Sequence, residues 1–184
     1  LQQLGRELTR QMAHALRTTY CSLMLLRSPT DELEIISRYA DPALLSGVTA
    51  NLPDRHRLAD FPATQAMLNR REPLIVYRTD PAADPAELDL LRNHQLYTLL
   101  NVPLVAINEA FGAVAWADNR PERVFSPDEL RLAQTLANQA AIAIDNARLF
   151  HEVIGMKQLM DNVFASIASG VITIDDAGRI ALYN

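Results

Sequence analysis

The chain has 184 residues, of which 49% are hydrophobic and 21% charged, and its formal net charge is −5. This composition is typical of a folded globular protein and excludes a disordered one. The acidic balance argues against a nucleic-acid partner, because phosphate contacts need clustered Lys and Arg. The apolar stretches are too short to span a bilayer and the first ten residues lack a signal-peptide core, so we expect no membrane contact.

The first third of the chain predicts a helix, a β-hairpin and an irregular segment. Leu1–Arg17 is predicted to be helical, because its apolar residues recur every three or four positions on one face. Tyr20–Arg27 is almost continuously apolar, as in a buried strand, and Leu33–Ala40 is predicted to be its hairpin partner. Two prolines and a glycine in residues 41–60 predict short helical turns and a mobile loop.

The middle of the chain alternates short helices with strands. Prolines open both predicted helices, at a position where the missing N–H costs nothing. Pro103 lies inside a predicted strand and indicates a bulge or a missing ladder donor there. The predicted elements are helices over Pro62–Asn69 and from Asp84 to about His94, and strands over Leu74–Tyr77, Tyr97–Ile107 and Phe111–Asp118.

A long helix is predicted to begin at Ser126. Ser126 is a capping residue, Pro127 takes the first helical position and Glu129 completes a capping box. No proline follows, and the first glycine, Gly155, indicates a kink or a boundary. Hairpins with helices outside them favour an α+β fold with an antiparallel sheet.

The last residues predict the start of another domain. Val171–Ile174 is a predicted strand, Asp175–Gly178 a turn, and a second strand begins at Arg179. Because an isolated hairpin is only marginally stable in water, we expect the sequence to be part of a longer protein. The predicted division is a complete domain over residues 1–150, a connecting helix over 151–169 and the start of a second domain over 170–184.

The complete domain resembles a GAF domain over Leu1–Phe150. The similarity lies in a Val-Pro-Leu strand at residues 102–104, a Gly-Ala-Val strand at 112–114, and Phe125 with Ser126 before an Ala- and Ile-rich helix. The resemblance implies a GAF-like antiparallel sheet of about five to six strands flanked by helices, with a long C-terminal signalling helix.

The tail resembles the opening of a PAS domain. An amphipathic helix containing Met160 and Val163 leads to Gly170-Val171-Ile172 and then to the acidic turn. Together the two resemblances imply a bacterial sensory array, most often upstream of a histidine kinase in a two-component system. An output that makes or degrades cyclic nucleotides is the alternative. We expect the PAS and output domains of the longer chain to be partners of this segment.

The sequence contains no familiar catalytic motif. The P-loop, HExxH, GxSxG and CxxC patterns are all missing, so we expect this segment not to be an enzyme. Cys21, the one cysteine, cannot form an internal disulfide, which fits a reducing cytoplasmic location. It also cannot supply the thiol relay of the GAF subgroup that reduces methionine sulfoxide. Within a buried strand it is expected to be a small hydrophobe.

The cofactors of other GAF domains are not expected here. Covalent bilin attachment needs a cysteine beside a histidine, and none lies near His94. A haem would need one axial histidine, for which His56 and His94 lie in the right region, but an ordinary surface histidine is favoured for both. We therefore predict no cofactor and no metal.

The cyclic-nucleotide motif of other GAF domains is matched only in part. Its Asn-Lys…Phe…Asp-Glu pattern corresponds to Asn119-Arg120, Phe125 and Asp128-Glu129, with Arg in place of Lys and a gap one residue short. Asp128 and Glu129 are better explained as acids at the positive end of a helix dipole.

A ligand pocket is implied between one face of the sheet and the irregular middle segments. Period-two alternation puts Tyr97 and Asn101 on one side of their strand, and Trp116 and Asp118 on one side of its partner. A mostly apolar cavity with a few polar anchors would suit an unidentified small molecule. The alternative is that Trp116 packs in the core and Asp118 belongs to a turn. The candidate ligand-binding residues are Arg57, Phe61, His94, Tyr97, Asn101, Trp116 and Asp118.

The terminal helix carries an apolar seam at alternating three- and four-residue steps, as in a coiled coil. Its alanines allow close approach of another helix, so we predict a parallel homodimer in which this helix transmits a signal. Pairing within the chain, against Leu1–Arg17, is the alternative, and both can coexist in a four-helix bundle. The predicted seam is Leu130, Ala133, Ala137, Ala140, Ile144 and Ala147.

Two functions from different classes remain open. In the first, a small molecule changes the packing of the sheet on the terminal helix, which requires different affinities for two arrangements. In the second, the domain is a dimerisation and spacer module that binds no ligand.

Overall fold

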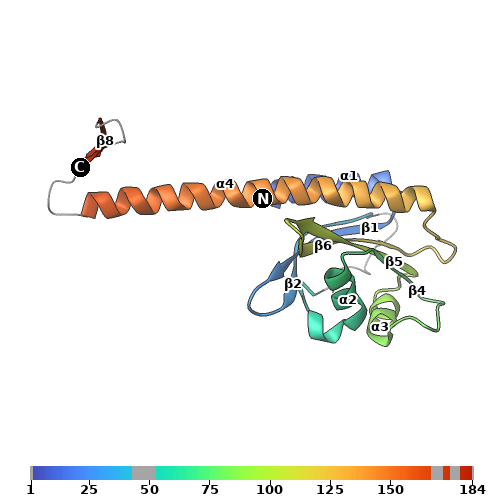
Figure 1. The fold of residues 1–184 in the computed structure, drawn as a ribbon. Helices are drawn as coiled ribbons and strands as arrows, with labels where there is room; N and C mark the ends of the chain where they lie inside the picture. The colour runs from blue at the N-terminus through green and yellow to red at the C-terminus, as the bar shows by residue number, and fades with distance from the viewer. Residues whose placement is uncertain (1, 43–52, 167–171, 175–178, 184) are drawn as a thin grey trace. The chain divides into compact units, whose positions relative to one another are not determined.

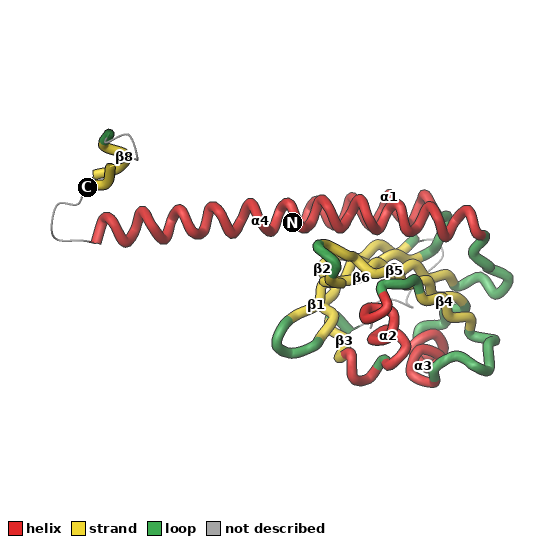
Figure 2. Tube along the Cα trace, in the orientation of Figure 1, coloured by secondary structure: helices red, strands yellow, loops and turns green. Residues whose placement is uncertain are grey.

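The computed structural model describes residues 2–42, 53–166, 172–174 and 179–183. Its contacts divide the chain into two units, residues 1–142 and 143–184. In the first unit an antiparallel sheet is covered by helices on both faces (Figures 1 and 2). α1 and the first part of α4 lie on one side of this sheet, and α2 and α3 on the other.

The described elements follow the predicted order closely. The helices are α1 (Gln2–Ala15), the short 3-10 helix η1 (Leu58–Asp60), α2 (Pro62–Arg70), α3 (Pro85–Asn93) and α4 (Pro127–Ser166). The strands are β1 (Tyr20–Arg27), β2 (Glu32–Ala40), β3 (Arg55–Arg57), β4 (Leu74–Tyr77), β5 (Thr98–Ala106), β6 (Glu109–Asp118), β7 (Ile172–Ile174) and β8 (Ile180–Tyr183).

The sheet of the first unit has six described strands in the order β3-β2-β1-β6-β5-β4. Every neighbouring pair is antiparallel. The predicted α+β fold and strand number are confirmed. β1 and β6 pair at the centre although they are far apart in sequence, so the first and last hairpins join into one sheet.

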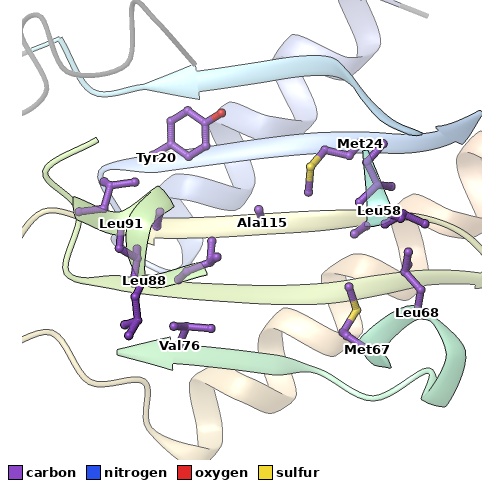
Figure 3. Close-up of a cluster of buried hydrophobic side chains, with 14 residues drawn as sticks. Tyr20, Met24, Leu58, Met67, Leu68, Val76, Leu88, Leu91 and Ala115 are labelled. Carbon is purple, nitrogen blue, oxygen red and sulfur yellow. The ribbon is translucent and has the colours of Figure 1, made fainter. Parts of the chain in front are cut away.

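Alternation along the central strands separates two cores. Trp116 of β6 faces α1, where its Nε1 donates a hydrogen bond to the carbonyl oxygen of Met12 at 3.1 Å. Its neighbours Ala115 and Ala117 face α2 and α3, because successive strand residues point to opposite faces. Small alanines leave room on that side, where Figure 3 shows Tyr20 and Leu88 in a cluster of buried apolar side chains.

Two backbone features fix the β5–β6 hairpin. A Cβ at Gly112 would lie 2.3 Å from the carbonyl oxygen of Met24, so only glycine lets β6 approach β1 this closely. Ile107 and Asn108 have φ values of 47° and 64° and form a two-residue turn, so β6 begins earlier than predicted. The ladder register shifts between Leu104 and Val105, one residue beyond the bulge expected at Pro103.

The predicted capping box opens α4. The backbone N–H of Glu129 donates to Ser126 Oγ at 3.3 Å, and the backbone N–H of Ser126 donates to Glu129 Oε2 at 2.8 Å. Arg123 then joins the start of α4 to the end of α1. Its Nη2 donates to Glu129 Oε1 and to the carbonyl oxygen of Leu16, both at 2.8 Å.

Most of the predicted seam of α4 is buried inside the single chain. The exposed fraction is 0% for Ala133 and Ala137, 2% for Ala140 and 3% for Ile144. Leu130 and Ala147 are half-buried. The single chain therefore already covers most of this stripe, while its pairing with Leu1–Arg17 and its role in a homodimer both stay predictions.

The second unit contains the remainder of α4 and a two-stranded sheet. α4 runs without interruption through Gly155, so no helix boundary occurs there. β7 and β8 pair antiparallel, as the predicted hairpin requires, and the predicted turn at Asp175–Gly178 lies outside the described residues. Within the part of the chain that the structure describes, none of the helices is long and apolar enough to cross a bilayer.

Candidate functional site

A cavity of about 60 Å³ lies between the sheet and the α2–α3 side of the first unit. Apolar side chains from β1, β2, β5 and β6 form most of its wall, and Leu58, Phe61 and Leu90 close it from the helical side. Figure 3 shows Tyr20, Met24, Leu58 and Ala115 in this region. The polar side chains in the wall are Tyr20, Ser22, His56, Thr64, Glu87 and Asn101.

Three of these polar side chains form a hydrogen-bonded row. Asn101 Nδ2 donates to Thr64 Oγ1 at 3.4 Å, and Thr64 Oγ1 donates to Glu87 Oε1 at 2.5 Å. With the Thr64 hydroxyl donating to the carboxyl group, the atom of Asn101 assigned beside Thr64 is its donating nitrogen. The row thus orients the Asn101 amide.

The other end of this amide is unsatisfied. Asn101 Oδ1 is buried and has no hydrogen-bond partner among the described residues. Leaving a buried acceptor unpaired costs about 1–3 kcal/mol. An orphan of this kind in a cavity wall is therefore a candidate contact for a bound molecule.

Glu87 has a structural task beside the cavity. α2 has no side-chain cap at Phe61, and Glu87 Oε1 accepts instead from the backbone N–H of Thr64 in the first turn of α2, at 3.2 Å. Only 1% of Glu87 is exposed. Burial raises the pKa of this carboxyl group, although its two hydrogen bonds from Thr64 act in the opposite direction.

Burial also shifts the pKa values of two other ionisable side chains in the wall toward favouring their uncharged forms. Burial lowers the pKa of His56, with smaller contributions from His94 and Arg38. The His56 ring stands edge-on to Phe61, with centroids 5.6 Å apart. Burial likewise raises the pKa of Tyr20. At neutral pH the imidazole and the phenol therefore contribute dipoles to the cavity, and no net charge.

Of the seven candidate ligand-binding residues, the structure brings Phe61 and Asn101 together in the cavity wall. His94 does not line the cavity but lies close enough to affect His56 electrostatically. Arg57 is exposed on β3, beside Glu32 of β2. Whether any of these side chains contacts a ligand stays a prediction.

The other three candidates lie elsewhere. Trp116 is on the α1 side of the sheet, where it packs in the core as the alternative interpretation held. Asp118 shares that face, is fully buried and pairs with Arg120, with Oδ2 2.6 Å from Nη2. Tyr97 precedes β5 and stacks under the guanidinium of Arg78, at 4.2 Å from the ring centroid.

The sequence held partial signals for the wall residues that were missed. Tyr20 and Ser22 alternate with the apolar Cys21 in β1, which indicates that they face the side opposite to Cys21. Glu87 follows Asp84 at capping-box spacing, yet only Asp84 caps α3, its Oδ1 accepting from the Ala86 N–H at 2.9 Å. The contact from Glu87 to α2 depends on tertiary packing.

Cys21 is fully buried on the α1 side of β1, and burial raises the pKa of its thiol. Its neighbours Tyr20 and Ser22 line the cavity, and Cys21 points to the opposite face of the sheet. Among the described residues, no three His, Cys, Asp or Glu side chains come together as metal ligands would.

The family model and the similar solved structures agree on one family. The sequence model of the GAF domain family matches residues 1–144. A GAF domain/HD domain protein from Geobacter sulfurreducens has a similar structure, with a TM-score of 0.63 and 21% identity over 78% of this chain and 90% of that chain.

Two further solved structures share the fold. A domain of a putative two-component sensor histidine kinase from Sinorhizobium meliloti is 19% identical, with a TM-score of 0.62 over 80% of this chain and 92% of that chain. The phycocyanobilin-bound GAF domain of a cyanobacterial phytochrome is 17% identical, with a TM-score of 0.69 over 82% of this chain and 87% of that chain.

Proposed function

Because the chain belongs to the GAF domain family over residues 1–144, we propose that it is a sensory module whose cavity binds a small molecule. The observation that carries this proposal is the buried Asn101 Oδ1, which lacks a partner among the described residues and belongs to the cavity wall. A bound molecule that donates an N–H or O–H to this oxygen would remove the cost of leaving it unpaired.

The wall also suggests the charge of the ligand. No Lys or Arg is among the described side chains that line the cavity. A phosphate or carboxylate ligand would lack a counter-charge there and would face Glu87. We infer that the ligand is an uncharged organic molecule with one hydrogen-bond donor.

The size of the cavity points the same way. About 60 Å³ suits a molecule of only a few non-hydrogen atoms, since one water needs about 10–15 Å³ on such a scale. A bilin does not fit this description, and the Cys21 thiol points away from the cavity. Our proposal therefore includes no covalent chromophore, no metal and no enzymatic reaction at this site.

A route for the signal runs through the sheet. Asn101 lies on β5 between Leu100 and Val102, both of them buried side chains that face the α1 side. A ligand that pulls on Asn101 would shift this strand against the helices on its other face. We propose that α4 transmits the shift to a PAS domain and an output, most simply a histidine kinase, in a cytoplasmic, parallel homodimeric protein.

The test compares two five-membered rings of nearly equal size. Pyrrole carries one N–H donor, and furan has an oxygen in its place. We expect pyrrole, and not furan, to perturb the amide NMR signals of β5 and α2 at millimolar concentration. In Asn101→Leu both rings should bind with similar, weak affinity, because the oxygen that distinguishes them is gone.

The spacer alternative makes a different prediction for the same titration. The modest volume of the cavity favours it, because a well-filled core needs no ligand. If neither ring perturbs the cavity residues at any concentration tested, the domain is a spacer and the sensory proposal is wrong. If both rings bind the wild type equally, the assignment of Asn101 as the donor's partner is wrong.

A further inference from the structure

The second half of α4 carries a row of exposed apolar side chains that differs from the predicted seam. Ile142, Leu149, Val153, Met156 and Met160 are between 50% and 67% exposed. Folded monomers rarely keep so many large apolar side chains exposed on one helix, so this row calls for a covering partner.

The spacing of the row is that of a heptad repeat. Steps of four and three residues alternate from Ile142 to Val163 without interruption. An average of 3.5 residues per turn keeps such a row on one side of a pair of supercoiled helices. The d positions are Ile142, Leu149, Met156 and Val163, and the a positions are Asn146, Val153 and Met160.

Two polar side chains agree with a parallel pair of identical helices. In this register Glu152 takes a g position and Lys157 the e position five residues later. When two copies run parallel and in register, g of one helix meets the following e of the other, so two Glu–Lys pairs form by symmetry. In an antiparallel pair g faces g and e faces e, so Glu152 would not lie beside a Lys157.

Asn146 is the one polar residue among the a positions, and it is exposed in the single chain. A single asparagine at an a position fixes register and favours two strands, because its amide can pair only with the same amide of the partner. A hydrophobic partner of a different sequence would leave that amide buried and unsatisfied.

We propose that residues 142–163 of two copies of this chain form a parallel, in-register coiled coil, with Asn146 opposite Asn146 and Glu152 beside the partner's Lys157. This inference assigns the interface of the homodimer proposed above and is independent of the cavity. It uses a different stripe from the predicted seam through Ala133 and Ala137, which the single chain already buries.

Charge reversal tests the register on the full 184-residue chain. We expect the wild type to dimerise in sedimentation equilibrium. Glu152→Lys and Lys157→Glu should each raise the dimer dissociation constant by about tenfold, and the double variant should restore it to within about threefold. The same reversal at the exposed Asp161, a b position, should change it by less than about twofold.

Disulfide trapping tests the contact face separately. Under mild oxidation Met156→Cys, at a d position, should form a covalent dimer, whereas His151→Cys on the outer face should not; Cys21 is fully buried and does not compete. If the wild type is still monomeric at a concentration of about 200 µM, both the homodimer and this interface are overturned. A dimer unaffected by charge reversal, or one trapped equally at His151, would overturn the interface alone.

Discussion

Replacing Asn101 with leucine should stabilise the ligand-free protein. Leucine has the same number of non-hydrogen side-chain atoms and removes the buried, unpaired Oδ1, which costs about 1–3 kcal/mol. It also removes the 3.4 Å hydrogen bond from Nδ2 to Thr64, worth about 0.5–1.5 kcal/mol. The balance is a gain of about 1 kcal/mol, or about 2–4 °C in the melting temperature for a chain of this size.

Urea unfolding and calorimetry of the two proteins measure this difference. Thr64→Val is the matched comparison, because it removes the hydroxyl that bonds both Asn101 and Glu87 and should destabilise by about 2 kcal/mol. An Asn101→Leu protein less stable than the wild type by about 1 kcal/mol or more would show that Oδ1 is not an unpaired, costly acceptor. The Asn101 amide would then serve the fold and not a ligand.

Three further changes test separate parts of the structure. The Glu87 pKa is raised in the folded state, so the wild type should lose stability relative to Glu87→Gln as pH rises above about 4.3. The loss should be at most about 1.4 kcal/mol per pH unit and should stop once the folded carboxyl group ionises. A stability difference that does not change with pH would contradict this. Gly112→Ala should cost about 2 kcal/mol or more, because the new Cβ would lie 2.3 Å from a backbone oxygen. Gly155→Ala should instead stabilise α4 by about 0.5–1 kcal/mol, because nothing lies within 4 Å of the new Cβ. Equal melting temperatures of the two variants would contradict this difference. Ser126→Ala should cost about 1 kcal/mol in thermal unfolding through loss of the capping box, and an unchanged melting temperature would count against that role.

Much of the fold could be predicted because its signals are local. β1 matched its predicted bounds because a continuous apolar run ends at Arg27, and α4 began as predicted because the capping box lies within four residues. β3 was missed for the opposite reason. Its sequence Arg-His-Arg has no apolar pattern, and the strand forms by pairing with β2.

The site was harder to predict because alternation defines two faces without saying what covers each. Trp116 and Asn101 both belong to central strands, and only the packing of α1 on one face decides that Trp116 is turned away from the cavity. The row from Asn101 to Glu87 crosses three elements that are distant in sequence. No spacing rule reports such a contact.

The exposed heptad row shows the same limit at the surface. Several apolar stripes follow coiled-coil spacing along α4, and the stripe with the smallest side chains, around Ala137, packs within the chain. Burial in the folded structure leaves Val153 and Met156 as the stripe available to a second copy.

We propose that the cavity beside Asn101 binds an uncharged hydrogen-bond donor. The most direct test of this proposal is a crystal structure of the wild-type protein soaked in pyrrole. We expect a ring in the cavity with its nitrogen about 2.9 Å from Asn101 Oδ1. Water alone in the cavity at saturating pyrrole, or a ring whose nitrogen faces away from Asn101, would contradict the proposal.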